Sequence, residues 1–391
     1  MRNIIAATIL ALTGASLAVW YLARRIERDV FRATPAAPEP LDLTVAAVGP
    51  ESVTMRPRTA GARAAARQPG VYGLQYLEGY GQLGEILSDD AAANAIERRF
   101  ELIYGQPPRP GDGARVDSFA FPLDPHVAHA LEWEAVDVPS GGRSNPAWLL
   151  PGEASHWAIL VHGKGARREE ALRLLPLLHA DGWASLTISY LNDTDCEQTG
   201  TYQFGATEWE DLETAAGFAV NRGATEILLV GYSMGGAIVL SFLARSSHAG
   251  LVRGLILDAP MTNLEEIVRI RSKRMRVPGR LLAPAMRRAV RAARLDWPHL
   301  DYHSAWNRDD LPVLLFHGDA DAVIPVSLSD TFAAGRPNIT YHRVPQAGHV
   351  RCWNTDRPRY ESAVRDFLAS LCVVPAPVSP SPRARGEGAG G

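Results

Sequence analysis

The sequence has only three cysteines among its 391 residues, at Cys196, Cys352 and Cys372. They are too few and too far apart to form a disulfide framework, and a zinc site needs ligands that are clustered. The chain also lacks an excess of either charge, since its formal net charge is −3 at pH 7. Such a balance gives no overall attraction to nucleic acid. We therefore expect no metal site and no nucleic-acid partner.

Charged residues are missing from residues 4–23, and Trp20 and Tyr21 lie near the end of this run. A helix of this length spans the roughly 30 Å of a bilayer core, and aromatic side chains often lie at its interface. A cleaved signal peptide is the alternative, but its apolar core is usually shorter and is followed by small residues. We expect residues 1–32 to form an uncleaved single-pass membrane anchor. The rest of the chain is expected on the cytoplasmic side, because four arginines follow the run: Arg24, Arg25, Arg28 and Arg32.

Composition divides the remainder of the chain. Residues 33–40 are rich in Ala and Pro and are expected to be a linker, and residues 373–391 have the Pro, Ser, Gly and Arg bias of a disordered tail. Residues 41–130 contain short alternating stretches and a segment, 89–102, for which we predict a helix that begins after Ser88. No function is predicted for this region.

Residues 131–372 show a different pattern, in which apolar runs alternate with helical segments. This alternation is typical of a mostly parallel sheet that is covered by helices on both faces. We predict eight strands, at 131–138, 147–150, 157–161, 184–190, 226–230, 255–257, 313–316 and 339–344, and helices at 169–180, 208–222, 234–245, 327–334 and 358–371.

Ser233 lies in the pattern G-x-S-x-G, between the predicted strand 226–230 and the predicted helix 234–245. A strand that leads through this pattern into a helix is the context of a nucleophile elbow. The turn is so sharp that side chains at Gly231 and Gly235 would collide with neighbouring backbone. The alternative is a glycine-rich turn with an incidental serine, but it does not explain the flanking strand and helix. We therefore predict that Ser233 is a nucleophile.

A serine hydroxyl needs a base and an acid that orients the base, and with this motif they follow in the order Ser, Asp or Glu, His. Asp321 follows a predicted strand, and His349 lies in the loop after the last one. Both positions fall at the carboxyl edge of the predicted sheet, where ligands of α/β proteins bind. Asp319 and Asp258 are the alternatives for the acid.

Acyl-transfer chemistry also needs N–H donors for the developing oxyanion. In proteins with this elbow, one donor is the backbone N–H after the nucleophile, here Met234, and the other comes from the loop after the third strand. That loop contains Lys164, and its backbone N–H is our candidate. We expect the Lys164 ammonium itself to be a solvated surface charge.

Together these motifs resemble those of a known family, the bacterial α/β-hydrolases grouped with prolyl oligopeptidase-like and serine aminopeptidase-like proteins. The resemblance implies an α/β-hydrolase fold with an eight-stranded, mostly parallel sheet and a helical cap insert. It implies a hydrolase of ester, thioester or amide bonds that needs no cofactor or metal. It also favours Asp321, because the family places the acid just before a short apolar run that ends here in Pro325. The resemblance rests on His162-Gly-Lys-Gly, Gly231-Tyr-Ser-Met-Gly-Gly, His317-Gly-Asp-Ala-Asp321 and Gly348-His349-Val-Arg-Cys-Trp-Asn.

The cap is expected at about 261–310, within the catalytic domain 131–372. Its stretch 269–294 holds ten Lys or Arg residues and no acid. Leu282, Met286, Ala289 and Ala293 share one face of a predicted basic amphipathic helix. Contact with a membrane surface and a solvated cap helix are both open alternatives.

We therefore expect a serine hydrolase that forms an acyl-enzyme with a small or lipid-like acyl substrate, and we favour a carboxylesterase or lipase. A serine peptidase of the prolyl oligopeptidase or aminopeptidase type is the first alternative. The second is a non-catalytic binding protein with the same fold.

Overall fold

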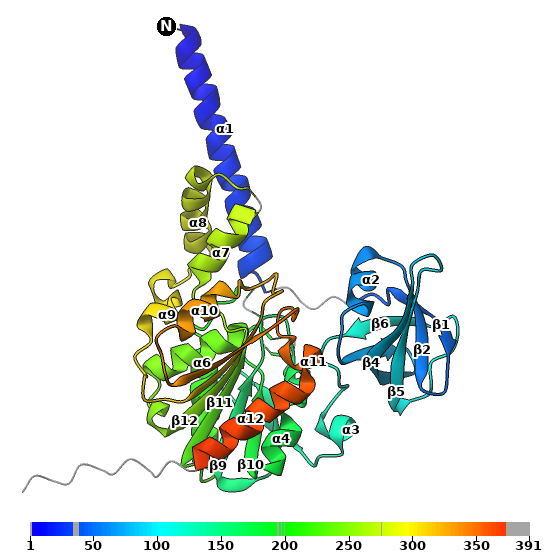
Figure 1. The fold of residues 1–391 in the computed structure, drawn as a ribbon. Coiled ribbons are helices and arrows are strands. Elements are labelled where there is room, and N and C mark those ends of the chain that lie inside the picture. Colours follow the sequence, from blue (N-terminus) through cyan, green and yellow to red (C-terminus); the bar gives the residue numbers. More distant parts are fainter. Residues whose placement is uncertain are drawn as a thin grey trace, which may run out of the picture.

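The computed structural model describes residues 2–33, 39–193, 195, 196, 198, 200–274 and 276–372. The expected tail, 373–391, and most of the expected linker, 33–40, lie outside these residues. Figure 1 shows a small barrel beside a larger sheet domain, from which the N-terminal helix and part of the expected cap project.

The region without a predicted function contains a closed six-stranded barrel, in which the strands are ordered β1-β2-β5-β4-β3-β6. The helix predicted at 89–102 is wrong, because these residues form the end of one strand and most of the next. Asn94 has φ of 51° at the turn between them, and Ile96, Arg98 and Phe100 alternate inward with the period of a strand. The barrel elements are β1 (Leu43–Val48), β2 (Ser52–Pro57), α2 (Ala60–Ala66), β3 (Tyr72–Tyr76), β4 (Gly79–Asp90), β5 (Ala95–Gly105) and β6 (Gly113–Asp117).

The sheet domain confirms the predicted fold class and all eight predicted strands. The strands are ordered β14-β13-β12-β11-β9-β10-β8-β7, and only the pairs of β8 with β7 and β10 are antiparallel. The strands are β7 (Glu134–Asp137), β8 (Pro146–Leu150), β9 (Glu153–Val161), β10 (Trp183–Ile188), β11 (Glu226–Tyr232), β12 (Val252–Asp258), β13 (Val313–Gly318) and β14 (Ile339–Val344).

Helices cover both faces of this sheet, so its central strands are apolar throughout. In β9, Ile159 and Val161 belong to one core, while Ala158 and Leu160 belong to the other. The first core is covered by α5 (Trp209–Val220), α6 (Met234–Arg245) and α10 (Ser327–Ala333). The second is covered by η2 (Arg168–Arg173), α4 (Leu175–Ala180) and α12 (Arg357–Cys372).

Helix α1 (Arg2–Ile26) contains the run without charges. Within the residues that the structure describes, no helix has both the length and the apolar character needed to cross a membrane. The expected single-pass anchor is therefore wrong, and the expected cytoplasmic orientation loses its basis. The end of α1 instead packs on the sheet domain: Ala23 and Ile26 join its core, and Phe31, in the following turn η1 (Glu27–Phe31), is fully buried.

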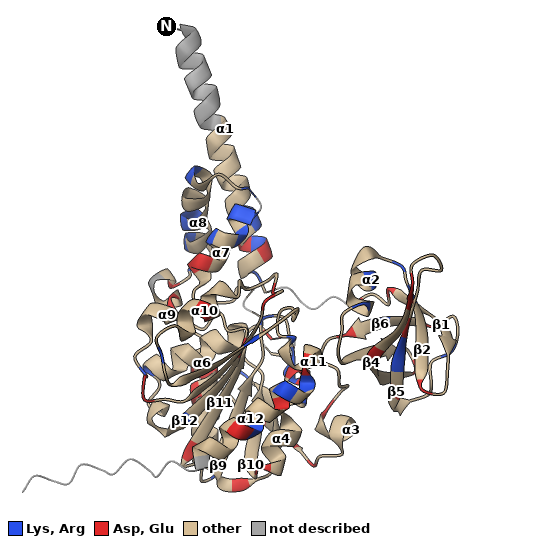
Figure 2. Cartoon of the chain, in the orientation of Figure 1, with Lys and Arg blue, Asp and Glu red and all other residues tan. Residues whose placement is uncertain are grey.

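The region expected to form the cap contains α7 (Leu264–Arg274), α8 (Gly279–Ala293), η4 (Trp297–Leu300) and α9 (Tyr302–Ala305). Helix α8 lies beside α1 (Figure 1), and Figure 2 marks the positions of basic residues along α7 and α8 in blue. The predicted apolar face of α8 is present, but Met286, Ala289 and Ala293 are buried in the core of the sheet domain. Leu282, the fourth residue of this face, is half-buried. The described residues give no support for the alternative of contact with a membrane surface.

Candidate active site

Ser233 lies at a sharp turn between β11 and α6, with φ of 52° and ψ of −114°. This conformation is unfavourable for a residue with a side chain, and such strain persists only where the surroundings hold it. The backbone N–H of Ser233 donates to the Asp258 carbonyl at 2.9 Å. A Cβ at Gly231 would lie 2.8 Å from the backbone of Gly236, and one at Gly235 would collide with the Val161 carbonyl. The two glycines are therefore needed for the turn to form.

The structure brings Ser233, His349 and Asp321 together. His349 Nε2 lies 2.9 Å from Ser233 Oγ, and His349 Nδ1 lies 2.7 Å from Asp321 Oδ2. Because the carboxylate accepts the proton on Nδ1, Nε2 is left as the acceptor for the serine hydroxyl. The His349 side chain is 21% exposed and that of Asp321 is fully buried, so a substrate can reach the serine and histidine but not the acid.

A second histidine contacts the same carboxylate. His317 Nε2 lies 3.2 Å from Asp321 Oδ2, and its Nδ1 lies 2.7 Å from Ser329 Oγ. Asp321 Oδ1 accepts the backbone N–H groups of residues 323 and 324 at 2.7 and 2.8 Å. Burial alone would raise the pKa of Asp321, but the hydrogen bonds from His317 and His349 lower it far below its usual value. Asp321 is therefore an anion whenever the protein is folded near neutral pH.

The two alternative acids lie elsewhere. Asp319 Oδ1 accepts the backbone N–H of Gln346 at 2.7 Å and so fixes the loop that precedes His349. Asp258 is buried at the end of β12, where burial raises the pKa of its carboxyl to about 6, although Arg173 and His317 lower it. The carboxylate hydrogen-bonded to His349 is that of Asp321.

The two expected oxyanion donors are the backbone N–H groups of Met234 and Lys164. Met234 begins α6 directly after Ser233, and the N–H groups of Met234 and Lys164 donate to no atom within the described residues. The neighbouring N–H of Gly163 is taken, because it donates to Glu170 Oε2 at 2.9 Å. The Lys164 N–H is therefore an unused donor. The adjacent Gly163 N–H, through its bond to Glu170, fixes the loop.

The Lys164 side chain is not the solvated charge that we expected. Its Nζ donates to the carbonyl of Val30, and it lies 5.4 Å from the Tyr202 ring centroid and 5.9 Å from that of Phe204. Burial lowers the pKa of the amine to about 8, and the charge of Arg271 adds to this effect. The segment after α1 is therefore tied to the loop that carries the candidate oxyanion donor.

A buried pair lies beneath that loop. His162 Nε2 contacts Asp193 Oδ2 at 2.8 Å, and both side chains are 2% exposed. Burial alone would lower the pKa of His162, but the charge and hydrogen bond of Asp193 raise it to about 9. Tyr190 stacks on the His162 ring, and its hydroxyl donates to the His162 and Gly163 carbonyls at 3.0 and 3.1 Å. His162 Nδ1 also lies 2.9 Å from the Gly163 carbonyl, so both ring nitrogens face acceptors, which favours the charged form of the ring.

Glu170 and Arg173 connect this loop to the one that carries His349. Arg173 Nη2 lies 3.6 Å from Glu170 Oε1, and both side chains are nearly fully buried. Arg173 Nη1 donates to the Val350 carbonyl at 3.0 Å and to Asn354 Oδ1 at 3.1 Å. The residue after His349 is therefore held by the same buried ion pair that holds Gly163.

Sequence reasoning did not find these supporting residues. The one signal was a pair of charges inside the apolar run 170–178, which is unusual for a segment that packs on a sheet. Asn354 carried no signal beyond its place in the motif that begins at Gly348, because its partners are distant backbone carbonyls. The described residues contain no group of three or more His, Cys, Asp or Glu side chains that could hold a metal ion.

Residues 158–363 match the family model described as the alpha/beta hydrolase family. The chain belongs to this family. The barrel, at residues 44–117, matches a model described only as a domain of unknown function. The family match does not distinguish the narrower group of prolyl oligopeptidase-like and aminopeptidase-like members.

A curated relative of this alpha/beta hydrolase is the putative esterase/lipase 2 of Mycoplasma genitalium, which is 30% identical over 103 residues. The match covers 26% of this chain and 37% of the relative, so the chain spans about a third of the relative's length. A solved esterase of Pyrococcus furiosus has a TM-score of 0.50 at 17% identity, over 64% of this chain and 95% of that one. Est1E from Butyrivibrio proteoclasticus, with ferulic acid bound, has a TM-score of 0.45 at 18% identity, over 61% and 99% of the two chains. The likeness to the Pyrococcus enzyme supports the fold.

Proposed function

We propose that this chain is a serine hydrolase that cleaves carboxylic esters through an acyl-enzyme on Ser233. The observation that carries the proposal is the His349 ring, which bridges Ser233 Oγ at 2.9 Å and Asp321 Oδ2 at 2.7 Å. These are the contacts that a general base and its orienting acid require. The strained elbow adds support, because it exposes the hydroxyl at the edge of the sheet.

In the first half of the reaction, Ser233 Oγ attacks the ester carbonyl carbon while its proton passes to His349 Nε2. The carbonyl π electrons move to oxygen, and the resulting oxyanion accepts hydrogen bonds from the N–H groups of Met234 and Lys164. His349 becomes a cation that the buried Asp321 anion stabilises. The tetrahedral intermediate then collapses: the bond to the alcohol oxygen breaks, and this oxygen takes the proton from Nε2.

In the second half, water replaces the alcohol. His349 Nε2 removes a proton from the water as its oxygen attacks the acyl carbon, and the same two N–H groups hold the second oxyanion. Collapse returns the proton to Ser233 Oγ and releases the carboxylic acid. Removal of one such N–H donor typically costs about 2.7 to 4 kcal/mol of transition-state stabilisation.

An ester substrate is favoured over an amide by the name of the curated relative, a putative esterase/lipase. The chemistry at Ser233 is the same for a serine peptidase, which stays the alternative substrate assignment. The two are separated by the ratio of kcat/KM for an aryl ester and for an anilide with the same acyl group. A preference for the anilide would contradict the ester assignment.

The decisive experiment is replacement of the nucleophile. Ser233→Ala should fold normally but lose nearly all hydrolysis of a p-nitrophenyl ester and all labelling by a fluorophosphonate probe, since the bond to the acyl group can no longer form. The matched control is Ser247→Ala, at a serine just beyond the far end of α6. It should keep both activities.

The same measurement tests the non-catalytic alternative. A binding protein with this fold would show neither turnover nor probe labelling in the wild type. Substantial turnover in Ser233→Ala would mean that another group is the nucleophile.

A further inference from the structure

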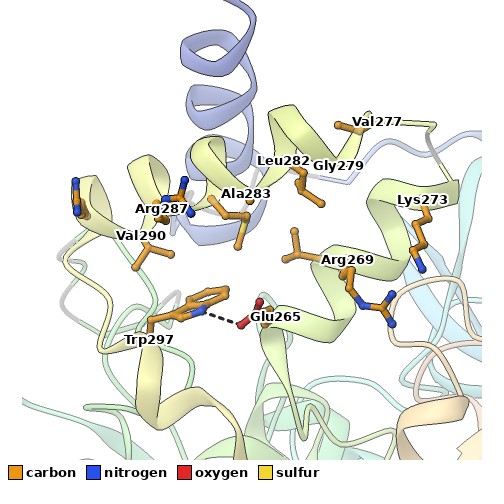
Figure 3. Close-up of a pocket in the computed structure, with 13 residues that line it drawn as sticks. Glu265, Arg269, Lys273, Val277, Gly279, Leu282, Ala283, Arg287, Val290 and Trp297 are labelled. Carbon is orange, nitrogen blue, oxygen red and sulfur yellow. Dashed lines mark hydrogen bonds between the residues drawn. The ribbon is translucent and has the colours of Figure 1, made fainter. Parts of the chain in front are cut away.

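A cleft of about 600 Å³ lies between α7 and α8, away from the residues around Ser233. Figure 3 shows side chains from both helices pointing into it, with Trp297 at one end. The volume is within the range of roughly 300 to 1,000 Å³ that is usual for small-molecule sites.

The walls of this cleft are apolar. Val268 lines it from α7, while Leu282, Met286 and Val290 line it from α8. These three residues of α8 are spaced by four, so they form one stripe along the helix. Because the backs of both helices are packed on the rest of the molecule, the stripe and Val268 leave an elongated apolar channel between the helices.

The rim of the cleft is cationic. Lys273 extends from α7, and Arg287 and Arg291 extend from α8. Within the part of the chain that the structure describes, none of these three side chains lies within 4.0 Å of a carboxylate oxygen. Glu265 is the one acid in the lining, and its carboxylate accepts a hydrogen bond from Trp297 Nε1 at 3.1 Å. Arg269 also lines the cleft and pairs with Glu266, whose charge acts on Lys273 as well. The lining therefore has four cationic side chains and one acid, and it carries a net positive charge.

We propose that this cleft binds a fatty acid, with the aliphatic chain between α7 and α8 and the carboxylate at Lys273, Arg287 and Arg291. The apolar channel selects a chain, and the unpaired cations select an anionic end. A neutral amphiphile would leave the cations unused, and a polyanion without a chain would leave the channel exposed to water. The proposal rests on the proposed function in one respect: a fatty acid is the carboxylic acid that an esterase would release.

The test is equilibrium binding of laurate to the full chain by calorimetry, at concentrations where laurate is monomeric. We expect one site, with decanoate bound about tenfold more weakly because two methylene groups are lost. Dodecyltrimethylammonium, which has the same chain with a cationic end, should not compete. Equal binding of the anionic and cationic amphiphiles would overturn the role of the rim.

Two variants distinguish binding by the cationic rim from a general attraction of laurate to the positive charge of α8. Replacing Arg287 and Arg291 with Gln should weaken laurate binding by about tenfold. The matched control replaces Arg280 and Arg288 with Gln, which removes the same number of charges from α8 at residues that do not line this cleft. An equal loss in the control would show that net charge, and not this cleft, binds the anion.

A change in the wall tests the channel. Leu282 is partly buried, and Leu282→Gln keeps a side chain of similar size but makes it polar. Laurate binding should fall, while the thermal unfolding midpoint and the hydrolysis of p-nitrophenyl acetate stay near their wild-type values. If laurate does not bind to the wild-type chain, the inference is wrong, whether or not Ser233 hydrolyses esters. Loss of ester hydrolysis in Ser233→Ala with laurate still bound would leave both proposals standing.

Discussion

We predict that Asn354 fixes the position of the loop that carries His349. It is fully buried in the short helix α11 (Cys352–Thr355), in the loop that carries His349. Its Nδ2 donates to the carbonyls of Val71 at 2.7 Å and Ser118 at 3.0 Å, and its Oδ1 accepts from Arg173. One side chain therefore joins the barrel side of the molecule to the histidine loop and to the buried ion pair.

Replacing Asn354 with Ala would leave three buried polar groups without their partner: the two carbonyls and one N–H of Arg173. Each such group costs about 1 to 3 kcal/mol, so the total loss is on the order of 4 kcal/mol once some water enters. This is a large share of the 5 to 15 kcal/mol that is typical of a folded domain. Urea denaturation followed by circular dichroism measures the loss directly.

The catalytic effect separates positioning from simple destabilisation. Because the loop also carries His349, a shift of about 1 Å should lower kcat by 10- to 100-fold while KM changes less. Asn338→Ala is the matched control, since Asn338 Nδ2 also donates to two carbonyls, of Arg308 at 3.3 Å and Leu311 at 2.8 Å. These bonds lie at the start of β14, at the opposite end of that strand from the histidine loop.

Asn338→Ala should lose stability and keep its kcat, measured well below the unfolding transition. Asn354→Asp provides a second variant, because it keeps the acceptor for Arg173 and removes only the two bonds to the barrel side. If Asn354→Ala lowers kcat no more than Asn338→Ala does, the reasoning about the loop is refuted.

Three further predictions concern charged groups. Asp321→Asn should lower kcat by about 10⁴-fold, because His349 then loses its anionic acceptor. Asp319→Asn and Asp258→Asn should lower kcat far less. Ester kinetics of the three variants measure the ranking, and the reverse order would contradict the assignment of the acid. The pKa of His162 is raised from 6.5 to about 9, so its pair with Asp193 should add about 3 kcal/mol to the free energy of unfolding below pH 6.5. This contribution should be lost as the pH rises through about 9. If the difference in stability between the wild type and His162→Gln did not shrink over that range, His162 would not be a buried cation. The pKa of Asp258 is raised from 3.8 to about 6, so ionisation of this buried carboxyl should destabilise the fold. As the pH rises from about 4 to about 7, the free energy of unfolding of the wild type should fall by about 3 kcal/mol relative to that of Asp258→Asn. A difference in urea midpoints that does not change with pH would contradict this.

The sheet domain was predictable from the sequence because its signals are local. Continuous apolar runs separated by amphipathic segments specify buried strands and covering helices without reference to partners far along the chain. The elbow is local too: Gly231, Ser233 and Gly235 lie within five residues, and their spacing is set by sterics at one turn. The position of His349 followed from the chain order of the motif and from the parallel arrangement of the strands.

The errors came from segments whose environment is set by distant residues. The run 4–23 and its flanking arginines have the pattern of an anchor, but Ala23 and Ile26, at the end of the helix, pack into the core of the sheet domain. The residues of 89–102 are compatible with a helix as well as with strands. They form strands because they pair with neighbouring strands of the barrel. The apolar face of α8 was correctly predicted, but what covers it depends on where α1 lies.

The buried network makes the barrel part of the active-site scaffold. Arg98 is fully buried in the barrel with no acidic partner within the described residues, and its guanidinium donates to the carbonyls of Gly84, Ala66, Gln68 and Gly70. Gly70 adjoins Val71, whose N–H donates to the Asn354 carbonyl at 2.8 Å while its own carbonyl accepts from Asn354 Nδ2. A guanidinium that binds four carbonyls fixes the backbone on which the histidine loop rests. Displacing this segment would move Asn354 and Arg173 together, because each leaves the other with an unpaired buried group. The barrel is therefore linked to the loop that carries His349 through the backbone of Val71 and the side chain of Asn354.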